Sequence, residues 1–207
     1  MRRLWHPVTL FALLLAMQSI AVKAADINVE KMPRSKNEGE YRNYPDVYRI
    51  QITGELKKND NQKFSDAVSK LLPLFGIVIL DSPGGELSSA LAIGKEIKLR
   101  GYSTVVKARD TCASACALVW LAGDTRYMEP SSKIGFHAAS VMKGNAAVES
   151  GFANALVGAY LDRLGLTTEA IEYITRPSPS DVQWLSIRHA MLLGINVTIS
   201  SEINSQK

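Results

Sequence analysis

The sequence predicts an α/β fold of repeated β-α units with a helical C-terminal part. Short runs of β-branched apolar residues, such as residues 77–80 (IVIL), are typical of buried parallel strands. Segments with apolar residues at helical spacing separate these runs. Alternation of this kind favours strands joined by right-handed crossover helices.

Hydrophobic period and turn residues define the elements in the first half of the chain. Alternating apolar residues predict a strand at 47–54, and helical spacing predicts helices at 61–72 and 86–100. Pro73 is expected to end the first helix, and Gly101 the second. The strand at 77–80 lies between these two helices and is followed by a tight turn.

The same patterns continue to the C-terminus, with no internal repeat. The remaining expected elements are a strand at 102–108, a turn at 109–111, a helix at 114–122, strands at 126–128 and 134–137, helices at 145–164, 169–175 and 185–193, and a strand at 196–200.

The N-terminus has the pattern of a secretory signal peptide. Arg2 and Arg3 precede a short apolar run, and small residues precede a cleavage site after Ala24 or Ala25. The run is too short to span a bilayer comfortably, so cleavage is favoured over an uncleaved anchor. We therefore expect a signal peptide at 1–24, an extended lead-in at 25–45, and a single domain at 46–207 that is periplasmic or secreted without a stable membrane anchor.

The net charge gives no reason to expect a nucleic-acid partner. Residues 1–24 contain three cations (Arg2, Arg3 and Lys23) and no acid, so their removal lowers the net charge from +4 to +1. The basic excess therefore belongs to the targeting segment.

Ser114 is the candidate nucleophile. A serine nucleophile needs a base to take its proton and backbone N–H groups aimed at the developing oxyanion. Ser114 begins an expected helix, where the N–H of Ala115 has no partner within the helix. Gly85, in the turn after a strand, is the candidate second donor because glycine permits a close backbone approach. His137 ends a later strand and is the candidate base.

Three segments together resemble the Clp protease proteolytic subunit, within the Clp/crotonase superfamily. Residues 81–85 (DSPGG) resemble the family's Asn-Ser-Pro-Gly-Gly turn, and residues 113–115 (ASA) resemble its Ala-Ser-Met nucleophile helix. Residues 126–130 and 134–137 (IGFH) resemble its Arg…Pro…Met-Ile-His segment. With its signal peptide, the chain more closely resembles the exported Clp-like proteins of bacteria.

This resemblance implies a Clp/crotonase-like fold and a serine hydrolase, most simply a peptidase. Carried over by position, Ser114 is the nucleophile, His137 the base, and Gly85 and Ala115 the oxyanion donors. The resemblance also implies a peptide or protein substrate and self-association. No cofactor is called for, and the two cysteines lack the partner ligands of a metal site.

The third member of the triad departs from the family pattern. The family places an aspartate before a Phe-Leu-Ser/Thr stretch, for which residues 184–186 (WLS) stand here, and an ungapped match puts Ser178 at the aspartate's position. Asp181 follows in the same loop and is the candidate orienter of His137. A Ser-His dyad, orientation by a backbone carbonyl, and a Ser-Lys dyad with Lys133 are the alternatives. The departure also motivates a second hypothesis, a binding or scaffolding protein that keeps the fold without catalysis.

Two cysteines flank the candidate nucleophile. Cys112 and Cys116 stand four residues apart, near the upper end of the spacing that a disulfide tolerates in a helix. A bridge between them would brace the turn that presents Ser114; two buried thiols are the alternative.

Overall fold

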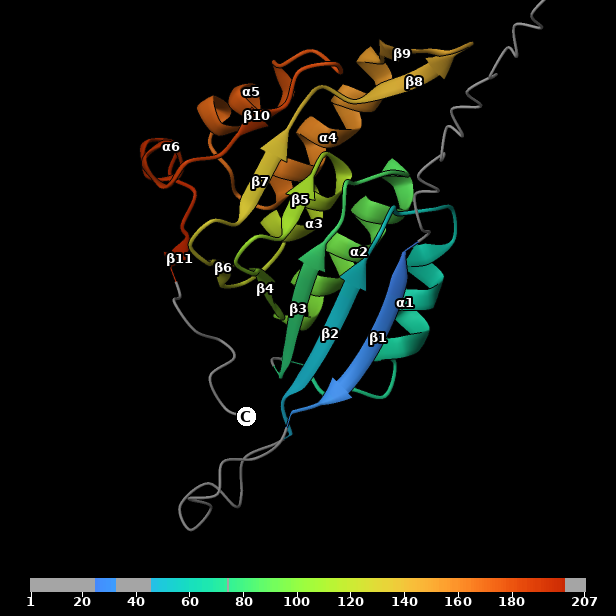
Figure 1. Ribbon diagram of the computed structural model, residues 1–207, viewed down its shortest axis with the longest axis vertical. Helices are drawn as coiled ribbons and strands as arrows, with labels where there is room; N and C mark the ends of the chain where they lie inside the picture. Colours follow the sequence, from blue (N-terminus) through green and yellow to red (C-terminus); the bar gives the residue numbers. More distant parts are fainter. Residues whose placement is uncertain (1–24, 33–45, 74, 200–207) are drawn as a thin grey trace, which may run out of the picture.

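The structure is a computed structural model that describes residues 25–32, 46–73 and 75–199 (Figure 1). The expected signal peptide, residues 1–24, and most of the expected lead-in lie outside this part. In the described residues, no helix has both the length and the apolar character needed to cross a membrane.

A six-stranded sheet forms the base of the molecule (Figure 1). Its order is β1-β2-β3-β4-β6-β11, and every neighbouring pair is parallel except β1 with β2. The strands are β1 (Asp26–Lys31), β2 (Tyr48–Thr53), β3 (Gly76–Asp81), β4 (Ser103–Val106), β6 (Arg126–Met128) and β11 (Thr198–Ile199).

Strand β1 lies where we expected only an extended lead-in. Ile27 pairs with Ile52 and Val29 with Ile50, in an antiparallel register. Both β1 side chains pack against the core. The alternation of apolar and polar residues over 26–31 is the signal that predicts this strand.

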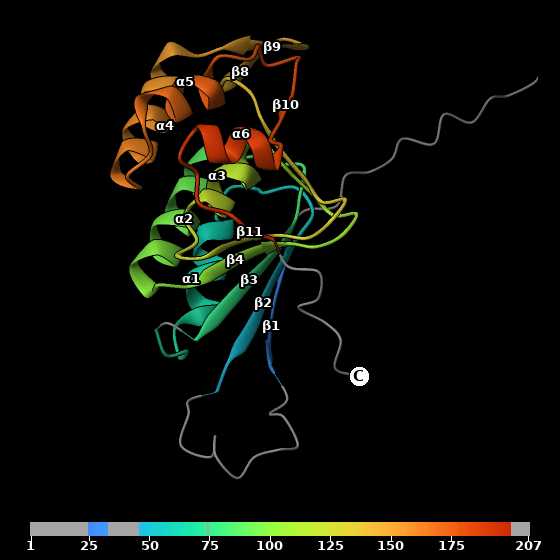
Figure 2. The same cartoon turned by 90° about the vertical axis from the view of Figure 1, so that its left-hand side faces the viewer.

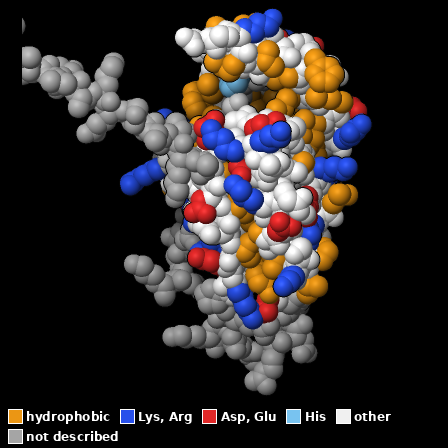
Figure 3. Space-filling view, turned by 90° about the vertical axis from the view of Figure 1, so that its right-hand side faces the viewer, with side chains coloured by type: hydrophobic (Ala, Val, Ile, Leu, Met, Phe, Trp, Pro, Cys, Tyr) orange, Lys and Arg blue, Asp and Glu red, His pale blue; other side chains and the backbone are white. Residues whose placement is uncertain are grey.

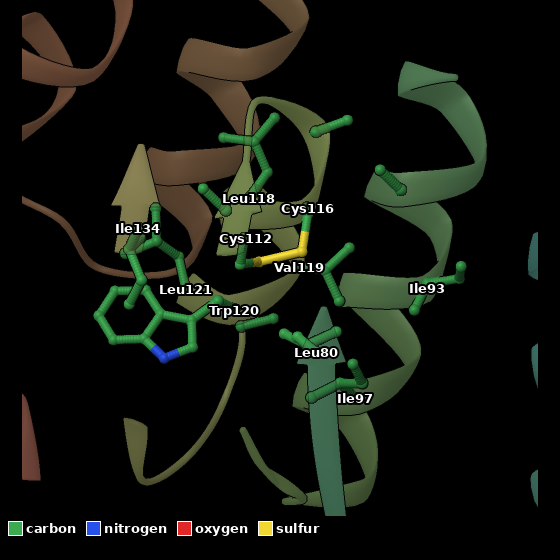
Figure 4. Close-up of a cluster of buried hydrophobic side chains, with 14 of the residues drawn as sticks. Leu80, Ile93, Ile97, Cys112, Cys116, Leu118, Val119, Trp120, Leu121 and Ile134 are labelled. Carbon is green, nitrogen blue, oxygen red and sulfur yellow. A yellow bond between two sulfur atoms is a disulfide. The ribbon is translucent and has the colours of Figure 1, made fainter. Parts of the chain in front are cut away.

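Three helices cover one face of this sheet (Figures 1 and 2). They are α1 (Asp60–Val68), α2 (Leu87–Arg100) and α3 (Ala115–Leu121). Gly101 ends α2 in the left-handed conformation, as the sequence predicts. Leu80 of β3, Ile93 and Ile97 of α2, and Val119 and Trp120 of α3 are among the buried side chains drawn in Figure 4.

The upper part of the molecule contains a three-stranded sheet, a hairpin and the remaining helices (Figure 2). Its elements are β5 (Thr111–Ala113), β7 (Lys133–Phe136) and β10 (Gln183–Trp184) in the sheet, β8 (Ser140–Lys143) and β9 (Ala146–Glu149) in the hairpin, and helices α4 (Gly151–Arg163), α5 (Thr168–Thr175) and α6 (Ile187–Leu192).

The prediction of a helix over 145–164 is wrong for residues 145–150, because the helix begins at Gly151. Residues 146–149 pair with β8 instead, and Gly144 turns the hairpin with a φ of 62°. The helix begins only after Ser150, whose hydroxyl accepts the Ala153 N–H. A glycine turn and an N-cap serine therefore place the boundary later than the helical spacing predicts.

Candidate active site

Ser114 lies in a sharp turn between β5 and α3. Its backbone has φ 56° and ψ −127°, a conformation that costs of order 1–3 kcal/mol for a residue with a side chain. The turn is held because the Ser114 N–H donates to the Gly135 carbonyl at 2.8 Å and the Ala117 N–H donates to the Ser114 carbonyl at 3.0 Å. Strand-turn-helix strain of this kind is how the nucleophile elbow of α/β-hydrolases exposes its serine.

A disulfide joins the two sides of this turn. Cys112 in β5 is bonded to Cys116 in α3, with a Cα–Cα distance of 5.2 Å, and both residues are buried in the core (Figure 4). The sequence-based expectation of a bridge is confirmed. The elbow residue Ser114 therefore lies inside a short covalent loop.

The turn after β3 approaches the elbow closely. A Cβ at Gly84 would lie 2.8 Å from the Ser114 Cβ and 2.9 Å from the Ala115 nitrogen. A Cβ at Gly85 would overlap the Leu56 carbonyl oxygen, and Gly85 has a φ of 133°. Only glycine satisfies both the contact and the backbone conformation at this turn.

Two backbone N–H groups beside these turns have no hydrogen-bond partner among the described residues. The Leu56 N–H donates to the Gly84 carbonyl at 2.7 Å, and the Glu86 N–H donates to the Leu56 carbonyl at 2.8 Å. Successive backbone groups of an extended segment point to opposite sides, so the Gly85 N–H faces away from Leu56. Among the described residues neither this N–H nor that of Ala115, the first residue of α3, has a hydrogen-bond partner.

Glu86 fixes the other end of the glycine turn. Its carboxylate accepts the Ser88 N–H at 3.1 Å and the Ser89 N–H at 2.7 Å, and so caps α2. Burial raises the pKa of Glu86, but the hydrogen bonds from Ser89 and Ser88 outweigh burial and hold this pKa below its ordinary value. The negative charge at the start of α2 is favourable for the helix dipole.

His137 follows β7 and lines the same pocket as Ser114. Its Nδ1 lies 2.8 Å from the carbonyl oxygen of Ala138. A carbonyl oxygen only accepts, so this contact assigns the proton to Nδ1 and leaves Nε2 as a free acceptor. In the described part of the chain no side chain bonds to Nε2 or to the Ser114 hydroxyl.

The pocket that these groups share is mainly apolar. Figure 3 shows a hollow with a histidine side chain and hydrophobic side chains around it. The pocket is lined by the four predicted site residues and by Leu87, Leu118, Phe136, Ala139, Ser140, Val157 and Ile174. Ser114, His137, Gly85 and Ala115 thus line one pocket at the carboxyl ends of β3, β5 and β7.

The other two predicted side chains lie apart from this group. Asp181 is exposed, its N–H donates to the Ser178 carbonyl, and it makes no hydrogen bond or ion pair with His137 in the described residues. Lys133 begins β7, does not line the pocket, and holds its Nζ 5.8 Å from the centre of the Trp184 ring. The position beside Nδ1 is instead filled by the Ala138 carbonyl, a backbone group that no side-chain motif reveals.

No group of histidine, cysteine and acidic residues in the described ranges is arranged to hold a metal ion.

Comparison with known proteins identifies the fold. No protein-family model matches the chain, and no curated protein matches it. Among solved structures, a mutant of the 1510-N membrane-bound stomatin-specific protease is similar with a TM-score of 0.56 and 19% identity, over 74% of this chain and 79% of that one. The same protease with a substrate peptide gives a TM-score of 0.54 and 19% identity, over 74% of each chain. A ClpP1 mutant from Listeria monocytogenes gives a TM-score of 0.53 and 19% identity, over 73% of this chain and 91% of that one.

These similarities show a Clp protease-like α/β fold, as the sequence predicts. At 19% identity they establish the fold alone, because one fold hosts many functions.

Proposed function

We propose that this protein is an exported serine peptidase with Ser114 as its nucleophile. The Ser114 Oγ attacks the peptide carbonyl carbon while His137 Nε2 takes the hydroxyl proton. The carbonyl oxygen becomes an oxyanion that accepts the N–H groups of Gly85 and Ala115. His137 then gives its proton to the leaving amine, and water hydrolyses the acyl-enzyme by the same steps in reverse.

The observation that carries this proposal is a strained serine that shares one pocket with a histidine and with two N–H groups that have no partner among the described residues. Strain at a residue with a side chain is kept where surrounding structure holds it, and such residues cluster at functional sites. The Clp-type neighbours are proteases, and one of them is described with a substrate peptide, which supports the same reaction class. The apolar pocket lining supports a substrate with an apolar side chain beside the scissile bond.

Export is proposed from the signal-peptide pattern of residues 1–24. The Cys112–Cys116 disulfide supports an oxidising compartment, the periplasm or the cell exterior. N-terminal sequencing of protein from the periplasmic fraction tests cleavage after Ala24 or Ala25. Size-exclusion chromatography with light scattering tests the self-association that the resemblance implies.

A fluorophosphonate probe tests the nucleophile directly. We expect the wild type to be labelled, Ser114→Ala to be unlabelled, and His137→Ala to be labelled at a strongly reduced rate. Ser140→Ala is the matched control, because Ser140 lines the same pocket and should keep wild-type labelling. A wild type that takes no label, or equal labelling of Ser114→Ala, would overturn the proposal.

Asp181→Asn tests the orientation of the base. With the Ala138 carbonyl on Nδ1, we expect Asp181→Asn to be labelled within about twofold of the wild type, whereas losing an orienting carboxylate costs up to about 10⁴-fold. A loss of that size would restore Asp181 as the third member of a triad.

The second candidate function is a Clp-fold binding or scaffolding protein. The observation that favours it is the exposed position of Asp181, which leaves the imidazole without a carboxylate partner in the described residues. If this is the function, the wild type should take no fluorophosphonate label. Peptide binding should then survive both Ser114→Ala and His137→Ala.

A further inference from the structure

One peptide unit links His137 to helix α4. The carbonyl of Ala138 lies 2.8 Å from His137 Nδ1, and the N–H of the same peptide group, that of Ala139, donates to the Asn154 side-chain oxygen at 2.7 Å. A peptide group is planar and rigid, so a bond at its N–H also fixes the direction of its carbonyl. The Asn154 side chain therefore holds the acceptor that meets the imidazole.

The Asn154 amide is itself held in one orientation. Its Nδ2 donates to the Glu149 carboxylate at 2.7 Å. A carboxylate accepts and does not donate, so this bond places the amide nitrogen toward Glu149 and the amide oxygen toward Ala139. Helix α4 begins between these two residues, with Ser150 as its N-cap.

Other hydrogen bonds hold the two peptide groups on either side of this one. The Ala138 N–H donates to the Pro177 carbonyl at 2.7 Å, and the Ser150 N–H donates to the Ala139 carbonyl at 2.9 Å. The segment after β7 is thus tied to both neighbouring elements without the Asn154 side chain. What this side chain adds is a hydrogen bond to the one peptide group that meets the imidazole.

We propose that Asn154 is a positioning residue that, through the peptide between Ala138 and Ala139, holds His137 in the Nδ1–H tautomer. The inference rests on the proposed function for its catalytic meaning. Its structural content, the tautomer of His137, is measurable whether or not the protein hydrolyses peptides.

This arrangement does the work of the carboxylate in a Ser-His-Asp site. When Nε2 takes the serine proton the ring becomes a cation, and the carbonyl dipole on Nδ1 stabilises that cation. Hydrogen bonds in series polarise one another, by about 10–30% per bond. The chain from the Glu149 carboxylate through Asn154 and the peptide group to the ring therefore strengthens the last contact.

The test uses Asn154→Leu, which keeps the branched shape and removes the acceptor, and the double variant Glu149→Gln/Asn154→Asp, which keeps the acceptor and avoids placing two carboxylates in contact. The first readout is the tautomer of His137, measured from imidazole ¹⁵N shifts on the neutral ring. His189, which lies on α6 and contacts Tyr173, is an internal reference in every spectrum. The second readout is the rate of fluorophosphonate labelling.

We expect Asn154→Leu to move the His137 proton from Nδ1 toward Nε2. Labelling should slow about tenfold, by analogy with the loss of hydrogen bonds that orient metal-ligating histidines. Glu149→Gln/Asn154→Asp should keep the tautomer and label within about threefold of the wild type. Asn145→Ala, at an exposed asparagine of the β8-β9 hairpin turn, is the matched control and should change neither readout.

Each outcome decides the proposal. An unchanged His137 tautomer in Asn154→Leu overturns it, even where labelling falls, because the residue is then only structural. A wild type that takes no label refutes the peptidase but leaves the tautomer measurement to decide the role of Asn154. A tautomer shift in Asn154→Leu that is absent in Glu149→Gln/Asn154→Asp supports the inference in either case.

Discussion

Reduction of the Cys112–Cys116 bridge is expected to lower both the stability of the fold and the reactivity of Ser114. The two cysteines are separated by four positions in the sequence. In the chain-entropy treatment, a closed loop of this length removes about 6 cal/mol/K from the unfolded chain, or about 2 kcal/mol at 25 °C. For a domain of this size that corresponds to a fall in Tm of about 4–8 °C.

Calorimetry with and without a phosphine reductant measures this change. The double variant Cys112→Ala/Cys116→Ala is the control, since it carries no bridge for the reductant to break. A Tm that stays within about 1 °C on reduction of the wild type, or an equal response of the double variant, would refute the reasoning.

The same experiment has a local readout at the elbow. The backbone strain at Ser114 costs of order 1–3 kcal/mol, which is comparable to the contribution of the bridge that encloses it. Well below its Tm, the reduced protein should therefore stay folded while its fluorophosphonate labelling slows by about tenfold. Unchanged labelling of the reduced, folded protein would show that hydrogen bonds alone hold the elbow.

Three further substitutions test contacts around the site. Gly85→Ala forces a Cβ against the Leu56 carbonyl and should slow labelling about 10²–10³-fold through loss of one oxyanion donor, with calorimetry showing that the variant is folded. Glu86→Gln should lower the free energy of unfolding, measured in urea, by about 0.5 kcal/mol at neutral pH. Because folding lowers the pKa of Glu86, this loss should shrink as the pH falls below 4.5. A loss that does not depend on pH would contradict this reasoning. Tyr160→Phe removes the 3.0 Å hydrogen bond to the Leu118 carbonyl and should cost about 1 kcal/mol in urea unfolding, a prediction that an unchanged midpoint contradicts.

Local signals were sufficient for much of the fold. The run at 77–80 and the helix that Gly101 ends are defined by residues next to one another in the chain, and both appear as the sequence predicts. The sequence does not predict the short strand β5: the expected turn covers 109–111 and no element is expected at 112–113, because three residues carry no measurable period. Its pairing with β7 is set by tertiary contact.

The candidate site also contains residues that the sequence reveals and contacts that it does not reveal. Ser114 and Gly85 stand in short motifs whose backbone demands are visible in the sequence. The contact of His137 with the Ala138 carbonyl and the hydrogen bond from Ala139 to Asn154 leave no such trace. Every residue type carries the same backbone carbonyl, so the sequence does not mark this contact. An asparagine in the first turn of a helix is ordinarily interpreted as a cap or a surface residue.

The order of the site residues along the chain has a consequence for the timing of activity. Gly85 and Ser114 emerge first during synthesis or export, His137 follows, and Asn154 comes last. A partly emerged chain therefore contains the candidate nucleophile but not the helix whose Asn154 contacts the peptide group beside the candidate base. In the proposed exported peptidase, the serine and a correctly oriented histidine would come together only after most of the chain has crossed the membrane.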